Sequence, residues 1–109
     1  MQEGIKKLEE LRARIGEAYL GDKSMAFNTA RLEALELDNL LEIAEATAYS
    51  AEGRRESRGA HARDDFQERD DENWLAHSIY SPETKQLSQR AVNFSPKIMG
   101  TMEPMIRKY

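Results

Sequence analysis

The first half of the chain carries apolar side chains at the three- and four-residue spacings typical of two amphipathic helices. In residues 1–20 this spacing is kept by aliphatic residues and one tyrosine: Ile5, Leu8, Leu11, Ile15, Ala18 and Tyr19. The stretch "GDKSMAFN" then breaks the pattern, and Gly21 is expected to end the first helix in a left-handed conformation. Asn28 or Thr29 is expected to cap a second helix. Two helices joined by a short link predict an antiparallel pair.

The second helix has an apolar stripe that is broader than one partner helix needs. The stripe is formed by Ala34, Leu37, Leu41, Ala44, Ala48 and Ala51, and it is widened by Leu40, Ile43 and Tyr49. Because two paired helices leave one side of each helix uncovered, a third partner is expected. No such partner is expected from the rest of the sequence.

The second half of the chain predicts an irregular segment followed by a β-hairpin. "WLAHSIY" and "LSQRAVNF" flank "SPETKQ", in which Pro82 suits the first central position of a turn. His77 alternates with Leu75 and Ile79, so a half-buried, hydrogen-bonded histidine is expected. The tail "SPKIMGTMEPMIRKY" is expected to be extended chain laid against a surface. The predicted fold is mainly α, an antiparallel helical bundle in 1–53, a loop rich in Arg and Asp in 54–73, and a hairpin with a tail in 74–109.

Composition narrows the class of protein. The chain has 109 residues, a formal net charge of −4 and no cysteine. This charge argues against a general binder of nucleic acid or of anionic membranes, because both need a basic face. No apolar run approaches the ~20 residues of a membrane span and no signal peptide is visible, so the chain is expected to be soluble. Its modest apolar content predicts low stability when it is alone.

Neither metal binding nor catalysis is well supported by the residues. A His61–Asp64–Asp65 cluster can be drawn, but the two histidines fit no zinc spacing. Ser57 and His61 could face each other on a helical turn, although Gly59 interrupts it and no oxyanion loop surrounds the serine. Glycine-rich phosphate-binding motifs are absent from the sequence. No residue is therefore assigned as catalytic, cofactor-binding or metal-ligating.

Charge is strongly patterned between Arg54 and Trp74. Residues 54–63 carry four arginines and one glutamate, whereas residues 64–72 carry six acids and one arginine. The basic residues of this span are all arginine, which favours planar, bidentate contacts over simple solubility. Gly59 indicates a backbone with an unusual φ or a close approach, and Phe66 and Trp74 can anchor the segment. We expect an ordered, interface-forming loop rather than a solvated one.

These residues also resemble a known family. "RRESRGAHARDDFQERDDENWLAHSIY" is similar to the C-terminal region of succinate dehydrogenase and fumarate reductase flavoprotein subunits, which carry an "ESRGAH" motif, an acidic run and a hairpin. "FNTARLEALELDNLLEIAEATAYSA" resembles the helix before that motif, and "PMIRKY" resembles the end of some of these chains. L-aspartate oxidases share a similar motif, but the "RDDENW" run favours succinate dehydrogenase.

The resemblance implies that the chain is a non-catalytic piece of a longer subunit. Such a subunit has an FAD-binding domain and a capping domain, and it oxidises succinate to fumarate through covalently held FAD. An iron–sulfur subunit then passes electrons to quinone, at the cytoplasmic face of the bacterial inner membrane or the matrix side in mitochondria. The resemblance thus implies that FAD and the catalytic residues lie outside this chain.

The resemblance also implies that a further helix precedes the first one. The bundle would then be spectrin-repeat-like and would lack its first helix here, so Met1 is not expected to be the natural start. We expect the isolated chain to form homo-oligomers that cover the stripe, because wet apolar surface costs about 25 cal/mol per Å².

The motif itself is expected to act in docking. Residues 55–61 match it, including Ala60. The docking set, expected to hold the helical part against the flavin domain, is Arg55, Glu56, Ser57, Arg58, Gly59, His61 and Arg63. Two other classes remain open: a stand-alone helical protein-interaction module, and a small enzyme built on Ser57 and His61.

Overall fold

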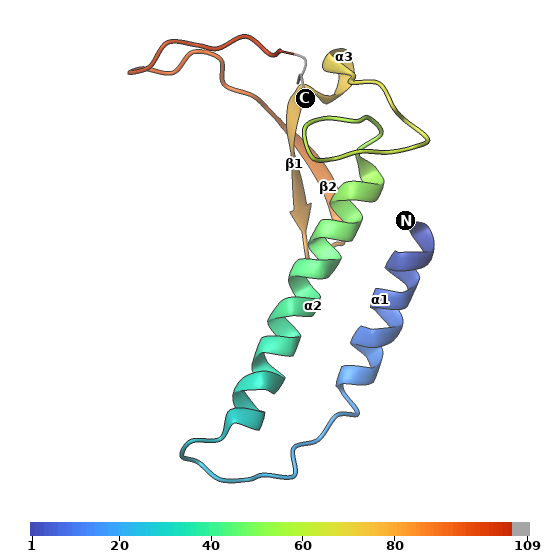
Figure 1. The fold of residues 1–109 in the computed structure, drawn as a ribbon, viewed down its shortest axis with the longest axis vertical. Coiled ribbons are helices and arrows are strands. Elements are labelled where there is room, and N and C mark those ends of the chain that lie inside the picture. Colours follow the sequence, from blue (N-terminus) through green and yellow to red (C-terminus); the bar gives the residue numbers. More distant parts are fainter. Residues whose placement is uncertain (106–109) are drawn as a thin grey trace.

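The computed structural model describes residues 1–105 of the chain. Two antiparallel helices lie side by side, and an irregular segment leads from the second helix into a two-stranded hairpin (Figure 1). The elements are α1 (Gln2–Ile15), α2 (Thr29–Gly53), α3 (Asp71–Trp74), β1 (Ala76–Ser81) and β2 (Gln86–Ala91). The predicted fold class, a mainly helical unit followed by a β-hairpin, is confirmed.

The helix ends agree only partly with the sequence. Asn28 caps α2, because its side-chain oxygen accepts a 2.8 Å hydrogen bond from the backbone N–H of Arg31. The predicted left-handed cap at Gly21 is wrong, since α1 already ends at Ile15 and Gly16 follows with a right-handed φ of −62°. Glycine is a poor helix former, and the last bonds of α1 are short-range turn bonds to Arg14 and Ile15.

The interface between the helices is largely polar. Leu41, 7% exposed, is the buried apolar side chain of the described residues. Beside it the buried Glu45 accepts a 2.9 Å hydrogen bond from Nε of Arg12 on α1. One turn later Tyr49 donates a 2.6 Å hydrogen bond from its hydroxyl to Glu9. Polar bridges of this kind therefore join the two helices next to the buried Leu41.

The hairpin is confirmed, and it packs on the C-terminal half of α2. Its register pairs Ala76 with Ala91 and Ser81 with Gln86. Tyr80 stacks on Tyr49 with ring centres 5.5 Å apart. The expectation that no third partner follows in the sequence is therefore wrong in part, because the hairpin covers one side of this half of α2.

The face of β1 that points inward differs from the prediction. Ala76, Ser78 and Tyr80 are half-buried, whereas His77 and Ile79 are exposed. Successive strand residues point to opposite faces, so the stacking of Tyr80 on α2 turns His77 outward. The expectation of a half-buried His77 is wrong for this reason.

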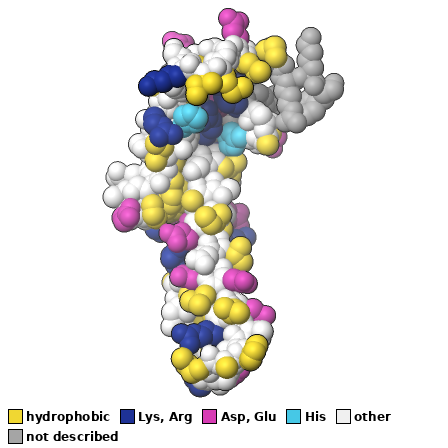
Figure 2. All heavy atoms as spheres, turned by 90° about the vertical axis from the view of Figure 1, so that its left-hand side faces the viewer, with side chains coloured by type: hydrophobic (Ala, Val, Ile, Leu, Met, Phe, Trp, Pro, Cys, Tyr) yellow, Lys and Arg dark blue, Asp and Glu magenta, His cyan; other side chains and the backbone are white. Residues whose placement is uncertain are grey.

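Much apolar surface stays uncovered by the described residues. The stripe on α2 is wider than its neighbours cover, as predicted, and its large exposed members are Leu37 50%, Leu40 65% and Ile43 67%. Leu32 and Leu35, which lie on the same helix outside the predicted stripe, are 61% and 58% exposed. Figure 2 shows apolar side chains spread along this elongated face. The tail after β2 is extended, but Ile98, Met99, Met102 and Met105 are exposed instead of lying against a surface. The end of the "PMIRKY" stretch, 106–109, lies outside the described residues.

No helix within residues 1–105 combines the length and the apolar character that a membrane crossing needs.

Candidate functional site

The loop after α2 is built around one buried carboxylate. Glu56 has no exposed surface. It accepts hydrogen bonds from Nε of Arg54 at 2.8 Å, from Nε and Nη2 of Arg58 at 2.8 and 3.0 Å, and from the backbone N–H of Asp70 at 2.9 Å. A buried charge needs such a full set of partners, because an unpaired carboxylate away from water is very unfavourable.

The partners decide the charge state of this group. Burial alone raises the pKa of Glu56, but hydrogen bonds from Arg58, from the N–H of Asp70 and from Arg54 outweigh it and lower the pKa from 4.5 to about 2. Glu56 is therefore ionised at neutral pH, and the loop contains a permanent anion between two guanidinium groups.

The two arginines carry the network to the next elements. Arg54 donates to the carbonyl oxygens of Trp74 and Ala76, the latter at 3.0 Å, and to the hydroxyl of Ser78 at 3.2 Å. Arg58 donates to Asp71 at 2.6 Å. The end of α2 is thus tied directly to α3 and to the first strand of the hairpin.

Arg63 closes the C-terminal end of α2. It is buried, and its Nη1 donates to the carbonyl oxygens of Ala51 at 3.2 Å and Glu52 at 2.7 Å. Its Nε and Nη2 form a bidentate pair with Asp65 at 2.8 and 2.6 Å. The last carbonyls of a helix have no partner within the helix, so a planar cation placed there both caps them and complements the helix dipole.

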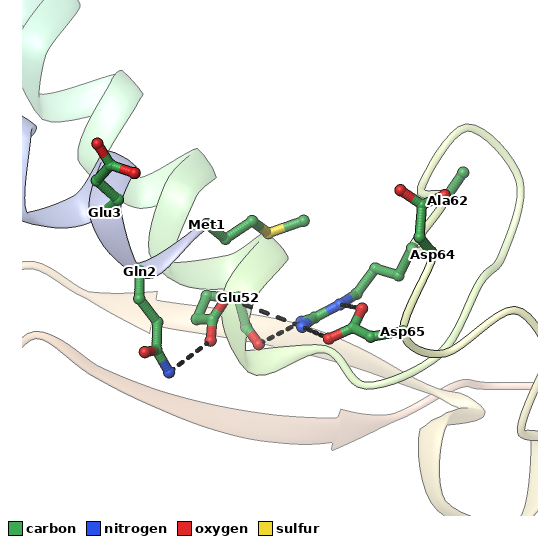
Figure 3. Close-up of a pocket in the computed structure, with 8 residues that line it drawn as sticks. Met1, Gln2, Glu3, Glu52, Ala62, Asp64 and Asp65 are labelled. Carbon is green, nitrogen blue, oxygen red and sulfur yellow. Dashed lines mark hydrogen bonds and ion pairs between the residues drawn. The ribbon is translucent and has the colours of Figure 1, made fainter.

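Beside this cap lies an open cleft between the start of α1 and the loop. Figure 3 shows Met1, Gln2 and Glu3 on one side and Ala62, Asp64 and Asp65 on the other, with Glu52 between them. Gln2 donates to Glu52, while Glu52 and Asp65 both face the guanidinium of Arg63. The cleft gathers carboxylates against one arginine that is already engaged, so it offers no strong anion site.

The predicted motif residues come together, but mostly as contacts with one another. Ser57 donates from Oγ to the carbonyl of Phe66 at 2.7 Å and accepts from the backbone N–H of Arg63 at 2.9 Å. His61 places Nε2 3.1 Å from the carbonyl oxygen of Arg54. Within the described residues these side chains are thus used in internal bonds and do not form a Ser–His pair.

The turn between Arg58 and His61 explains the glycine. The two residues exchange backbone hydrogen bonds of 2.8 and 3.0 Å, and Gly59 between them has a φ of 59°. The expectation of an unusual backbone at Gly59 is confirmed, since a residue with a Cβ would be strained there. Gly59 and Ala60 are exposed at the tip of this turn. Arg55, which precedes the turn, is also exposed.

The possible metal cluster is not assembled. Residues 1–105 contain no group of three or more His, Asp or Glu side chains able to hold a metal ion. Of the three residues considered, Asp65 is paired with Arg63 and His61 faces a carbonyl oxygen.

Sequence reasoning missed Arg54 and the short helix α3. Arg54 was counted only as charge, although it joins Glu56 to the hairpin. Asp70 caps α3 by accepting from the N–H groups of Glu72 and Asn73 at 3.1 and 3.0 Å. The run "DDEN" contained this signal, because a helix start favours Asp at the cap and acids in the first turn.

Comparison with known proteins identifies the family of this chain. A family model described as "Fumarate reductase flavoprotein C-term" matches residues 1–109. The chain belongs to this family. In this chain the "ESRGAH" stretch, residues 56–61, contributes Glu56 and Arg58 to the hydrogen-bond network of the loop.

Individual relatives of the chain are flavoprotein subunits as well. A succinate dehydrogenase flavoprotein subunit of Coxiella burnetii is 50% identical over 107 residues, which cover 98% of this chain and 18% of that protein. The mitochondrial succinate dehydrogenase flavoprotein subunit of Oryza sativa is 40% identical, covering 100% of this chain and 17% of that protein. A fumarate reductase flavoprotein subunit of Haemophilus influenzae is 44% identical, covering 100% and 18%. The chain thus spans less than a fifth of the length of these relatives.

The ionised state of Glu56 makes stability depend on acid pH. Because its pKa is lower in the folded chain than its ordinary 4.5, the stabilisation is complete above pH 4.5 and is lost as the pH falls toward about 2. The difference corresponds to roughly 3 kcal/mol in the free energy of unfolding. Denaturation followed by circular dichroism from pH 7 to pH 2 should show this loss.

Glu56→Gln should weaken the fold at pH 7 and flatten its acid dependence. Glu68→Gln, the same exchange at an exposed position of the loop, is the control and should leave both unchanged. Identical pH curves for the two variants would contradict the central role of Glu56.

Proposed function

We propose that this chain is the non-catalytic C-terminal structural part of a succinate dehydrogenase flavoprotein subunit. The observation that carries the proposal is the full-length family match together with 50% identity to a subunit of that name. The engagement of Glu56, Ser57, Arg58 and Arg63 in internal bonds supports a structural role. Relatives named as fumarate reductase subunits keep that enzyme as the alternative, with L-aspartate oxidase as a more distant one.

In this proposal the whole subunit oxidises succinate to fumarate with FAD and passes electrons to an iron–sulfur subunit and on to quinone. It would lie peripherally at the cytoplasmic face of the bacterial inner membrane, or on the matrix side in mitochondria. The described residues do not fit an FAD site: in residues 1–105 no strand leads through a glycine-rich turn into a helix, and Gly59 is the glycine with a left-handed φ. FAD is therefore assigned to other domains of the subunit.

Turnover by the full-length subunit, assembled with its iron–sulfur partner, tests this assignment. The complex should contain FAD and should oxidise succinate with an artificial electron acceptor faster than it reduces fumarate, and it should not oxidise aspartate. Faster fumarate reduction would favour the alternative enzyme, and oxidation of aspartate would refute the assignment.

The residues proposed for docking divide into those that are bonded within the loop and those that are exposed. Glu56, Ser57, Arg58 and Arg63 shape the loop, and the exposed parts of the set are Arg55 and the turn at Gly59. Within the described residues Arg55 makes no hydrogen bond or ion pair, so its guanidinium is free for a carbonyl or carboxylate of the flavin domain. His61 is half-buried, with Nε2 near the carbonyl oxygen of Arg54, so it is neither fully internal nor fully exposed.

Substitution in the full-length subunit separates docking from loop shape. Arg55→Ala should lower FAD retention after gel filtration severalfold while the melting temperature changes little, because a surface contact is lost. Arg58→Ala should lower both, because Glu56 and Asp71 lose a shared partner. Arg14→Ala on α1 is the control. FAD retention that is the same in all three variants would refute docking through this loop.

The exposed stripe on α2 also supports homo-oligomers of the 109-residue chain alone. Four aliphatic side chains of α2 are each more than half exposed, Leu40 and Ile43 in the stripe and Leu32 and Leu35 beside it, and each gains about 1–2 kcal/mol when it is covered. Light scattering should show a mass that rises with concentration, and Ile43→Lys should return the chain to a monomer. Met25→Lys, at an exposed apolar position outside α2, serves as the control. A monomer at all concentrations would contradict the idea.

A further inference from the structure

The seam between α1 and α2 carries two carboxylates that lie close together. Glu45 of α2 is buried, and Glu9 of α1 lies at the surface of the same seam. Each has its Oε1 atom within 4.0 Å of one shared atom, Nζ of Lys85. Carboxylates held this close repel each other, and the burial of one of them strengthens the repulsion. The helix pair therefore needs positive charge at this point.

The helices supply only part of that charge. Nε of Arg12 on α1 donates a 2.9 Å hydrogen bond to Oε2 of Glu45. Oε1 of the same carboxylate is buried and has no hydrogen-bond partner among the described residues. Tyr49 donates to Glu9 at 2.6 Å but brings no charge. In the ion pairs of residues 1–105, the helices thus place one cation at these two carboxylates.

The second cation comes from the hairpin. Lys85 directly precedes β2, and its Nζ lies 3.3 Å from Oε1 of Glu9 and 4.0 Å from Oε1 of Glu45. The same atom lies 5.7 Å from the ring centre of Tyr49. An ammonium group has three N–H donors, so it can serve both carboxylates at once. With Lys85 in place, two cations balance two anions.

The turn holds Lys85 in an unusual backbone conformation. Its φ is 53°, in the left-handed region that residues with a Cβ seldom adopt. Such a conformation persists where surrounding contacts hold it, and the contacts of Nζ with α1 and α2 are of this kind. Tyr80 fixes the approach of the hairpin by stacking on Tyr49. Figure 1 shows the hairpin running along α2, so that its turn lies beside the helix pair.

The pair formed by Glu9 and Lys85 is charged at neutral pH but open to water. Hydrogen bonds from Tyr49 and from Lys85 lower the pKa of Glu9, and the hydrogen bond with Glu9 raises the pKa of Lys85. The side chains of Glu9 and Lys85 are 45% and 41% exposed. An exposed pair contributes little by itself, but here the same ammonium also faces the buried Glu45. Salt therefore screens this contact more than it screens the buried Glu56 network.

We propose that the hairpin turn is a strap that closes over the seam, and that Lys85 fastens α1 through it. Without Lys85, Arg12 alone faces Glu9 and Glu45, and α1 opens from α2 more often. Within the described residues the strap shares no hydrogen bond with the Glu56 network, so α1 opens while the loop after α2 stays closed. This inference goes beyond the proposed function and holds for whichever reaction the whole subunit carries out.

Hydrogen exchange of the full-length subunit, read on peptides by mass spectrometry, tests the proposal. Lys85→Gln should speed exchange in residues 2–15 by about threefold and leave residues 54–74 unchanged. Lys85→Arg keeps the charge and should keep exchange slow. Lys97→Gln is the matched control, because Lys97 is exposed and makes no ion pair within residues 1–105. No effect of Lys85→Gln on residues 2–15, or an equal effect on residues 54–74, would overturn the proposal.

A second substitution separates charge balance from a loss of packing. Glu9→Gln added to Lys85→Gln should reverse part of the faster exchange, because Arg12 then faces one carboxylate, that of Glu45. The glutamine can still accept from the hydroxyl on α2, so the helix contact is kept. Glu10→Gln, at an exposed neighbouring position, should give no such rescue. A double variant that exchanges as fast as Lys85→Gln alone would remove the charge balance from the account.

Salt gives a further readout that packing alone would not change. Raising NaCl from about 0.1 M to about 1 M shortens the screening length from about 10 Å to about 3 Å. Exchange in residues 2–15 should rise severalfold in the unaltered subunit and in Lys85→Arg, and it should not rise in Lys85→Gln. Exchange that is independent of salt in the unaltered subunit, or that rises equally in Lys85→Gln, would overturn the strap.

Discussion

A single buried anion organises the second half of this chain. Glu56 is removed from water, and its charge is tolerable only because Arg54, Arg58 and the N–H of Asp70 surround it. These three partners come from the end of α2, from the turn at Gly59 and from the start of α3. Satisfying one carboxylate therefore brings three separate segments to one point. The hairpin is held to the same point because Arg54 also donates to the carbonyl oxygen of Ala76 and to the hydroxyl of Ser78 in its first strand.

Arginine suits this role for a geometric reason. A planar guanidinium can serve several acceptors at once in fixed directions, as Arg63 does with two helix carbonyls and a bidentate carboxylate. The compact ammonium of a lysine could not span that set. The absence of lysine between Arg54 and Trp74 is thus explained by what the loop has to hold, not by its net charge.

The balance between polar and apolar contacts is unusual for an independent domain. One apolar side chain, Leu41, is buried among the described residues, while several leucines, isoleucines and methionines are exposed. A small fold normally gains most of its stability from burying such groups. The network around Glu56 gives this chain a defined shape, and the exposed α2 face gives it surface suited to further packing. Both features agree with a family whose members are several times longer.

The sequence alone determined the local elements, because their causes are local. Apolar spacing specified α2, Asn28 capped it, Pro82 and its flanks specified the hairpin, and Gly59 marked the left-handed turn. The "ESRGAH" pattern was sufficient to indicate the family, because a motif is recognised from its residues without knowledge of the structure. Periodicity did not reveal that α1 stops at Ile15, because the apolar spacing of the sequence continues at Ala18 and Tyr19 after the helix has ended.

Tertiary structure alone decided which side of each element is used. Whether His77 or Tyr80 faces inward depends on the stacking with Tyr49, a contact between residues far apart in the chain. The same holds for Arg54 and Asp70, which acquire their roles only when the loop folds back to Glu56. Charges of opposite sign are common along this segment, so many pairings were compatible with the sequence, and only distance and burial select the ones that form.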